Sequence, residues 1–394
     1  MGKVGRATNP KQQQHHSTTK NHHHQHNTMK NVANLVAKCG KGKAAPVIAV
    51  AGSTGAVGVE FLKLMEERGT QVSELRLLAS ARSAGKVQRF RGKDIKVQEM
   101  TKDSFKGVDV AFFSAGGTQS KAFCGPAADA GAVVIDNSSA FRMDPNCPLV
   151  VPEVNPKAAF DAPKGIIANP NCSTIIMNVA VYPLHEKFGV ERCVVSTYQA
   201  SSGAGAAAME ELQQQARDWV SGKELTKKIF GRQYIWNLFS HNSKMDTEIG
   251  YNEEEMKMIK ETAKIFGGSV SAGKWPNVGP NNSPFGIAPT CVRVPTLRAH
   301  CESINLTFRA PVDLNEVKKV LSSAPGVELV DDRAANKFPE PIDASGRDPV
   351  LVGRLRHDLS LKNPKLGLEM FISGDQIRKG AALNGIQILE LLLK

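Results

Sequence analysis

The spacing of apolar residues in the first half of the chain changes from strand-like to helix-like, which predicts strands followed by helices. Residues 47–51 (VIAVA) form a continuous apolar run, as expected for a strand buried on both faces. A glycine-rich loop follows, and apolar side chains then recur at helical spacing from Phe61 to Met65, ending at Gly69. We expect a strand, a tight loop and a helix, the first unit of a parallel α/β sheet.

Further segments repeat the buried-strand pattern. They are residues 74–80, 108–117, 132–139 and 165–169, and several are apolar runs rather than alternations. Such runs indicate a parallel sheet that is covered by helices on both faces. Because open α/β sheets bind ligands at the carboxyl ends of their strands, Ser114 and Gly116 are expected to approach a cofactor.

The loop after the first strand has the GxxGxxG spacing of a phosphate-binding turn. Its glycines permit a tight turn and let the backbone approach a pyrophosphate at the amino end of the helix. Glycine turns are common elsewhere, so the motif depends on the strand and helix around it. The residues expected to contact a dinucleotide are Gly52, Ser53, Thr54, Gly55, Ala56 and Val57.

The end of the second strand indicates which dinucleotide binds. An NAD site usually ends this strand with an acidic residue that accepts a hydrogen bond from the ribose 2′-hydroxyl. Here the strand runs into Ser80, Arg82 and Ser83 instead. A guanidinium and hydroxyl groups suit a 2′-phosphate, so the pattern favours NADP. An ordinary solvated arginine is the alternative.

One cysteine stands where a strand gives way to a helix. Cys172, in NPNCSTI, follows the strand at 165–169 and precedes a helical pattern that starts near Ser173. Unpaired N–H groups and the positive end of a helix favour a thiolate there. From position alone, a reactive nucleophile and a buried structural cysteine are equally supported.

The net charge of +12 is concentrated at the N-terminus. Residues 1–45 contain eight Lys or Arg and no Asp or Glu, so the rest of the chain carries only +4. Residues 11–31 also hold six of the ten histidines, and this polar composition predicts that residues 1–45 form a disordered extension. An acid-free basic leader resembles an organelle transit peptide, although it contains only one Arg and one Ser. We expect a cytoplasmic protein, with a plastid or another organelle as the alternative.

Composition argues against several other classes of protein. The seven cysteines are scattered, form no CxxC pair and have no regular spacing with the histidines outside the extension. Neither a disulfide framework nor a metal site is therefore expected. No apolar run approaches the roughly 18 residues of a membrane span, so we expect no membrane association. Nucleic-acid binding would rest only on the charge of the extension and is not expected.

From about residue 46 onwards, the motifs resemble those of the aspartate-β-semialdehyde dehydrogenase family of bacterial and plant type. The matching segments, in chain order, are AVAGSTGAVG, LLASARSAGK, DNSSAFRMD, VPEVN, ANPNCST, TYQASSGAG, EEEMKM, CVRVPTLRAH and GDQIRKGAALN. The resemblance implies an α/β fold with a Rossmann-type NADP-binding domain (residues 46–172 and 374–394) and a second α+β catalytic and dimerisation domain (173–373). The C-terminal helix would return to the first domain. A homodimer or homotetramer is also implied.

The resemblance further implies an NADPH-dependent reduction of L-4-aspartyl phosphate to aspartate semialdehyde with release of phosphate, a step in lysine, threonine, methionine and isoleucine biosynthesis. Cys172 would attack the acyl carbon and form a thioacyl intermediate. His300 would act as acid and base, because a histidine can titrate near the working pH. Gln199 would orient the acyl group.

The substrate's charged groups require partners of opposite sign. The resemblance assigns the phosphate to Arg142 and Lys257, the carboxylate to Arg293 and the ammonium group to Glu254. Glu254 and Lys257 stand three residues apart on a predicted helix, so both can face one cleft. Further cofactor contacts are implied at Ser202, Gly203 and Gln376.

Three points stay open. Strand alternation alone would place Arg293 and His300 on opposite faces, unless Pro295 interrupts it. Gln376 stands where the family usually has Asn. Residues 267–289, rich in Gly, Pro and Asn, are expected to form a long loop that is disordered or acts as a lid or interface.

Two other functions compete with this interpretation. An N-acetyl-γ-glutamyl-phosphate reductase would share the architecture, but that family typically has a bulky aromatic residue where Ser173 stands. A non-catalytic NADP-sensing protein would be expected to lack Cys172, His300 or Gln199, all of which are present.

Overall fold

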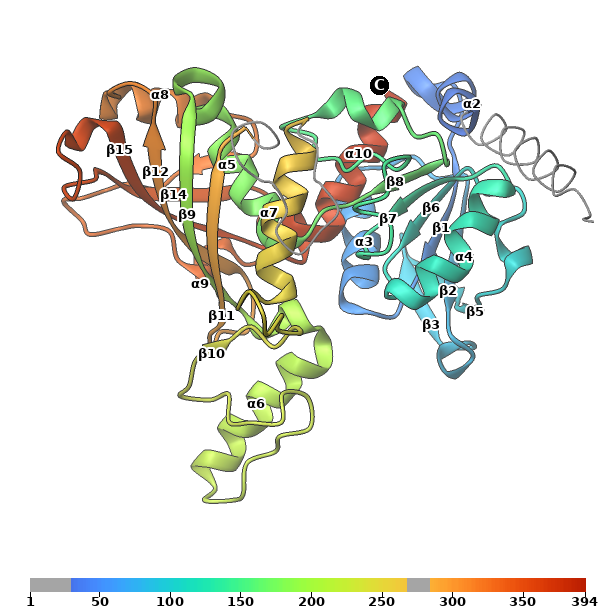
Figure 1. Cartoon of the computed structure of the whole chain (residues 1–394). Helices are drawn as coiled ribbons and strands as arrows, with labels where there is room; N and C mark the ends of the chain where they lie inside the picture. Colours follow the sequence, from blue (N-terminus) through green and yellow to red (C-terminus); the bar gives the residue numbers. More distant parts are fainter. Residues whose placement is uncertain (1–29, 268–283) are drawn as a thin grey trace, which may run out of the picture.

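Two β-sheets form the body of the protein, and they lie on opposite sides of Figure 1. The computed structural model describes residues 30–267 and 284–394. The first sheet has the strand order β5-β2-β1-β6-β7-β8, and every pairing in it is parallel. Its strands are β1 Val47–Ala51, β2 Glu74–Ala79, β5 Gln98–Glu99, β6 Val110–Phe113, β7 Val133–Asp136 and β8 Ile166–Ala168. A hairpin of β3 (Val87–Phe90) and β4 (Lys93–Lys96) lies between β2 and β5 in the chain.

Helices cover both faces of this sheet, which explains its continuous apolar runs. On one face, α2 (Lys30–Cys39), α3 (Ala56–Glu67) and α10 (Leu383–Leu393) pack on alternate strand residues such as Val50 and Phe112. On the other face, α4 (Gly117–Asp129) packs on the remaining residues, including Ala49 and Phe113. The sheet is parallel and covered on both faces, as the apolar pattern predicts, and its strand order is Rossmann-like, as the family resemblance implies.

The helix α2 corrects the prediction that residues 1–45 are disordered. Leu35 and Val32 are buried against the first sheet and α10, and the Asn31 amide donates to the carbonyl oxygens of Ala128 and Ala132 at 2.7 and 3.0 Å. A short apolar stripe within a polar segment was enough to form this contact. The prediction for residues 1–29 lies outside the described residues.

The second sheet is mixed and has the order β10-β11-β9-β12-β15-β14-β13. Helices α5 (Cys172–Phe188), α7 (Glu253–Ile265) and α8 (Leu314–Ser323) contribute to the core on one of its faces. Its strands are β9 Val190–Gln199, β10 Phe239–Ser240, β11 Gly286–Arg293, β12 His300–Phe308, β13 Val327–Leu329, β14 Val350–His357 and β15 Gly367–Gly374.

Two connections join the sheets. Helix α5 begins directly after β8 of the first sheet and packs on the second, whereas β15 of the second sheet leads through the π-helix η8 (Arg378–Ala382) into α10 on the first. The C-terminal helix therefore returns to the first sheet, as expected. The remaining elements are α6 (Ala206–Val220), α9 (Pro341–Ala344) and the 3₁₀ turns η2 Gly40–Gly42, η3 Ala81–Ser83, η4 Lys102–Phe105, η5 Pro156–Phe160, η6 Ser201–Ala204 and η7 Pro364–Leu366.

Helix α6 and the chain after it project away from both sheets, at the bottom of Figure 1. The long loop predicted at 267–289 ends earlier in the structure than expected, because residues 286–289 belong to β11 and pair with β9. That ladder overrides the low strand propensity of Gly286 and Pro289. Residues 268–283 of the predicted loop lie outside the described residues.

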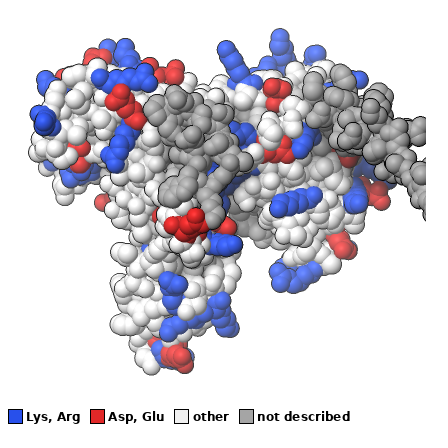
Figure 2. Space-filling model, viewed as in Figure 1, with Lys and Arg blue, Asp and Glu red and all other residues white. Residues whose placement is uncertain are grey.

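Charged side chains of both signs are spread over the face shown in Figure 2. Lys and Arg side chains are interspersed with Asp and Glu over both sheets and the α6 projection. Within residues 30–267 and 284–394, every helix is too short or too polar to cross a bilayer.

The packing of α2 can be tested with a cavity-forming substitution. Leu35→Ala should lower the free energy of unfolding by about 2–4 kcal/mol, because it removes a buried side chain. Asn34→Ala on the exposed side of the same helix is the control and should change it by less than about 0.5 kcal/mol. Urea unfolding followed by circular dichroism measures both, and equal stability of the two variants would contradict the docking of α2.

Candidate active site

The glycine loop after β1 has the geometry of a cradle for phosphate groups. Gly52 has φ +85°, and a Cβ atom on it would lie 2.4 Å from the Ser114 carbonyl oxygen. A Cβ on Gly58 would lie 2.3 Å from the Gly52 oxygen. Only glycine fits at either position, so the loop stays tight and the amino end of α3 remains open to a ligand.

A cavity of about 530 Å³ lies over this loop and the end of β2. It contains half of the residues predicted to bind the dinucleotide: Gly52, Thr54, Gly55, Ser80, Arg82, Ser83 and Ser114. The residues present therefore fit a dinucleotide, with backbone N–H groups for a pyrophosphate and a guanidinium nearby.

Seven predicted cofactor residues do not line this cavity; four of them line the cavity described next, and three line neither. Ser53 is fully buried below the loop, and its N–H donates to the Leu78 carbonyl at 3.2 Å. Ala56 is the first residue of α3, and Gly116 is the N-cap of α4. Their contribution is to the shape of the loop and helix ends.

The cavity also contains residues that the sequence did not single out. Glu99 enters from β5, which pairs with β2 through Ala79. Gln119 and Phe123 enter from α4. Glu99 follows the β3–β4 hairpin in the chain, so no local pattern connected it with the end of β2.

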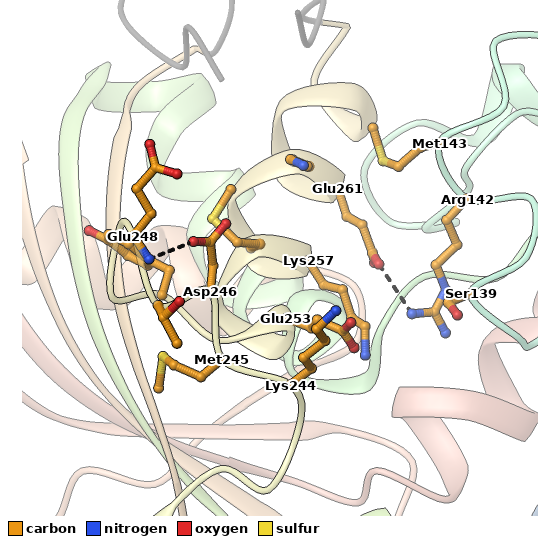
Figure 3. A pocket seen from close by; sticks show the side chains of 14 residues that line it. Ser139, Arg142, Met143, Lys244, Met245, Asp246, Glu248, Glu253, Lys257 and Glu261 are labelled. Atoms are coloured by element: carbon orange, nitrogen blue, oxygen red, sulfur yellow. Dashed lines mark hydrogen bonds and ion pairs between the residues drawn. The ribbon is translucent and has the colours of Figure 1, made fainter. Parts of the chain in front are cut away.

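A second cavity, of about 300 Å³, brings together residues from widely separated segments. Most of the predicted catalytic and substrate-binding residues line it, as do four of the predicted cofactor residues. The predicted residues in its wall are Val57, Arg142, Cys172, Gln199, Ser202, Gly203, Glu254, Lys257, Arg293 and Gln376. Arg142 and Lys257 also line an adjacent wider cavity of about 690 Å³, shown in Figure 3.

Cys172 is the first residue of α5 and the only cysteine of the seven that is not buried. Asn171 caps the helix, and its side-chain oxygen accepts from the Thr174 N–H at 3.2 Å. Gly380 packs behind the cysteine, because a Cβ on it would lie 2.8 Å from the Cys172 Cβ. The cysteine is thus held at the helix terminus with its side chain toward the cavity.

The electrostatic state of Cys172 differs from the expectation of a thiolate. Burial and the nearby Glu254 carboxylate raise the pKa of Cys172 to about 12, against the opposing effects of Arg293, Arg142 and the Ser173 N–H. The helix terminus does not compensate for the loss of solvent. In the protein without ligands the group is therefore a thiol at neutral pH.

Glu254 is the charged centre of the cavity. Its Oε1 accepts from the Asn171 amide at 2.8 Å and from the Gln199 amide at 3.2 Å, and its Oε2 accepts from Lys257 Nζ at 3.1 Å. Although burial acts in the opposite direction, Lys257, His241 and the Asn171 amide hold the pKa of Glu254 well below its usual range. Glu254 is an ionised acceptor, which suits an ammonium group.

Arg293 and His300 converge on Gly203, although they lie on different strands. A Cβ on Gly203 would lie 2.6 Å from Arg293 Nη1 and 3.0 Å from His300 Nε2. Arg293 ends β11 and His300 begins β12, and these two strands flank β9. Because the two residues lie on different strands, alternation along a single strand does not place their side chains on opposite faces. The two side chains lie together behind η6, with His300 just beyond the cavity lining.

His300 is held in one tautomer. The Ala200 N–H donates to its Nδ1 at 3.0 Å, so the neutral ring carries its proton on Nε2, which has no partner among the described residues. Burial and Arg293 lower the pKa of His300 well below its usual value. The expectation that it titrates near working pH is thus wrong for the protein without ligands, where the ring is a neutral donor.

Gln376 spans the junction between the sheets. Its Oε1 accepts from the Ala299 N–H at 2.9 Å, and its Nε2 donates to the Ser202 hydroxyl. The amide thereby connects the residue before His300 to η6, and it also lines the cavity.

His241 is a cavity residue that the sequence reasoning missed. Its Nδ1 accepts from the Ser243 N–H at 3.2 Å, and burial lowers the pKa of His241 to about 4. No residue pattern around it signalled a ligand. Among the described residues, no group of three or more His, Cys, Asp or Glu could hold a metal ion.

Comparison with protein families supports the two-part organisation. Residues 47–162 match the family described as "Semialdehyde dehydrogenase, NAD binding domain", and residues 181–379 match "Semialdehyde dehydrogenase, dimerisation domain". The fold class expected from the sequence is confirmed, with a parallel Rossmann-like sheet and a second, mixed sheet.

The relatives and solved structures compared below are named aspartate-semialdehyde dehydrogenase. The chain is 51% identical to the aspartate-semialdehyde dehydrogenase of Prochlorococcus marinus over 88% of this chain and 95% of that protein, and 42% identical to the Bacillus subtilis protein over 88% and 97%. The structure of aspartate semialdehyde dehydrogenase II from Vibrio cholerae complexed with ASA matches with a TM-score of 0.81 at 42% identity, covering 89% of this chain and 98% of that one. The Candida albicans enzyme with NADP matches with a TM-score of 0.66 at 26% identity, covering 89% and 98%. The chain belongs to the semialdehyde dehydrogenase family.

Proposed function

We propose that this protein is an aspartate-semialdehyde dehydrogenase, which reduces L-4-aspartyl phosphate to the semialdehyde in amino-acid biosynthesis. The observation that carries the proposal is one cavity that combines a partly exposed cysteine with a separate partner for each charged group of that substrate. The curated relatives bear this name over nearly the whole described chain.

The cations and the carboxylate would orient the substrate. Arg142 and Lys257 stand at the side where the wider cavity opens, which suits a phosphate. Arg293, held by Asn242 and the Ala200 carbonyl at 3.0 Å each, would bind the carboxylate, and Glu254 the ammonium group. A bound ammonium group would offset the Glu254 charge that raises the pKa of Cys172.

Cys172 would attack the acyl carbon of the substrate. The new carbon–sulfur bond forms as the bond from that carbon to the phosphate oxygen breaks, and the leaving phosphate, held between Arg142 and Lys257, takes up the proton of the Cys172 thiol. The glycine loop would hold NADPH, which would supply the hydride that reduces the thioester. His300 Nε2 would donate a hydrogen bond to the acyl oxygen that Gln199 orients and would stabilise the oxyanion of the hemithioacetal. Collapse of this oxyanion breaks the carbon–sulfur bond and releases the aldehyde, and the Cys172 thiolate then takes up a proton from solvent.

The cysteine chemistry is tested in the oxidative direction. Cys172→Ser should lower kcat for phosphate-dependent oxidation of aspartate semialdehyde by at least about 10³-fold, because a hydroxyl is a far weaker nucleophile than a thiolate. Cys39→Ser, on α2, is the control. NADPH formation is followed by its absorbance, and oxidation that proceeds without phosphate would refute the mechanism.

We also propose NADP as the dinucleotide that binds over the glycine loop. Arg82 lines the cavity beside Ser80 and Ser83, where a guanidinium and hydroxyls suit a 2′-phosphate. Glu99 lies in the same cavity, and its carboxylate would repel a 2′-phosphate. Arg82 therefore has to outweigh this repulsion to give a preference for NADP.

Reversing the charge of Arg82 tests the proposed preference for NADP over NAD. Arg82→Asp should raise the KM for NADPH by roughly 100-fold and leave the KM for NADH nearly unchanged, because only NADPH carries the 2′-phosphate. Arg89→Asp, exposed on β3, is the matched control. Equal weakening of both cofactors by Arg82→Asp would exclude the proposed contact.

A homodimer or dimer of dimers is proposed for the assembly. The matched family segment at 181–379 is described as a dimerisation domain. Within it, the α6 projection exposes large apolar side chains: Trp219, Val220, Ile229, Trp236 and Leu238. Exposed apolar groups gathered on one projection favour burial against a second copy.

Disruption of this surface should change the mass in solution. Trp236→Asp combined with Leu238→Asp should shift the protein toward monomer, whereas Val87→Asp, an equally exposed apolar position on β3, should not. Size-exclusion chromatography with light scattering measures the mass. A double variant that keeps the wild-type mass would show that the projection is not the interface.

The cellular location proposed is the cytoplasm, with a plastid or other organelle if the acid-free extension acts as a leader. Since α2 packs on the first sheet, removal of a leader would be compatible with the fold if it ended before Lys30.

A further inference from the structure

The buried carboxylate of Glu261 lies between two parts of the candidate active site that come from different segments. Glu261 is on α7, seven residues after Glu254, and is 1% exposed. Its spacing from Glu254 and Lys257 places all three on one face of the helix. Figure 3 shows it pointing from α7 toward Arg142.

One oxygen of Glu261 holds the guanidinium of Arg142. Glu261 Oε1 accepts from Arg142 Nη1 at 3.1 Å, a pair in which both side chains are buried. The Asn169 and Asn137 carbonyl oxygens accept from Nε and Nη2, each at 2.9 Å. A guanidinium carries one N–H on Nε and a pair on each terminal nitrogen. These contacts therefore fix its plane and leave one N–H on Nη1 and one on Nη2 for an anion.

The other oxygen holds the backbone in front of the nucleophile. Glu261 Oε2 accepts from the Asn171 N–H at 2.6 Å. Asn171 is the N-cap of α5, its side chain is already bonded to Thr174 and Glu254, and Cys172 follows it directly. With its N–H also bound, Asn171 cannot rotate without breaking a buried hydrogen bond.

We propose that Glu261 is a positioning residue that sets the distance between the phosphate-binding guanidinium of Arg142 and the sulfur of Cys172. This rests on the proposed roles of Arg142 and Cys172. The sulfur must reach the acyl carbon while the leaving phosphate stays on the guanidinium, so both must be fixed relative to each other. A single carboxylate that bonds both the guanidinium and the backbone N–H next to Cys172 satisfies this requirement. Glu261 does not itself line the cavity that contains the sulfur, although it lines the adjacent wider cavity.

The side chain required at position 261 follows from the two N–H groups that donate to it, one from Arg142 and one from Asn171. Each oxygen faces an N–H, so the ionised form satisfies both. A glutamine side chain has one acceptor oxygen and can satisfy only one of them, and a methionine of similar length can satisfy neither.

The test compares Glu261→Met and Glu261→Gln with Glu316→Gln, an exposed glutamate on α8. The phosphate KM and kcat of semialdehyde oxidation report on Arg142 and on Cys172. Hydrogen exchange of peptides covering residues 169–175, followed by mass spectrometry, reports on the Asn171 N–H without requiring activity.

For Glu261→Met we expect a phosphate KM raised by roughly tenfold or more, a kcat lowered by a similar factor, and faster exchange at Asn171. Glu261→Gln should change at least one of these readouts, by a smaller amount, and Glu316→Gln should change none of them. In an Arg142→Lys background, Glu261→Met should no longer raise the phosphate KM, because its effect passes through the guanidinium.

A Glu261→Met protein with the wild-type phosphate KM, or with wild-type exchange at Asn171, overturns the inference. Should the methionine variant not fold, Glu261→Gln decides, and wild-type values in all three readouts overturn it. Wild-type protein without phosphate-dependent activity would instead refute the proposed function, and the exchange readout would still decide whether Glu261 holds Asn171.

Discussion

The return of the C-terminal segment to the first sheet is the contact on which the candidate active site depends. Leu383, Ile386 and Leu389 of α10 are fully buried there, and burial of each contributes about 1.5–3 kcal/mol. Because α10 is anchored, η8 is held against the start of α5, where Gly380 meets Cys172. The same segment carries Gln376 to the residue before His300. One apolar contact thus brings the ends of both sheets to one cavity.

The buried charges in and beside this cavity have polar partners: two of them form ion pairs, and Arg293 is held by the Asn242 side chain and the Ala200 carbonyl oxygen. Glu254 is bonded to Lys257, and Arg142 to Glu261. An unpaired buried charge would be strongly destabilising, so the pairs are a condition for folding as well as for binding. A substrate with two anionic groups and one ammonium group would redistribute these pairs rather than meet bare charges. The neutral thiol of Cys172 is consistent with a site that becomes reactive only when filled.

The sequence allowed prediction of those features that local patterns specify. Continuous apolar strands, the glycine loop and the helix start beside Cys172 are properties of neighbouring residues, and the structure has each of them. Features set by contacts between distant segments were not predictable in this way. Arg293 and His300 meet because β11 and β12 flank β9, and Glu99 reaches the Arg82 cavity through strand pairing. The pKa values of Cys172 and His300 follow from burial, which no local motif reveals.

Helix α2 also changes how two distant segments of the described chain are related. Cys39, the last residue of α2, and Gly42 line the same surface hollow as Leu393 and Lys394 of the C-terminal segment. Circular permutation requires that the two segments to be joined lie close together, because a short linker can then connect them without strain. A chain reopened at an exposed turn, such as the one between β3 and β4, could keep both sheets intact. The order of the segments along the chain is therefore separable from the arrangement of the site.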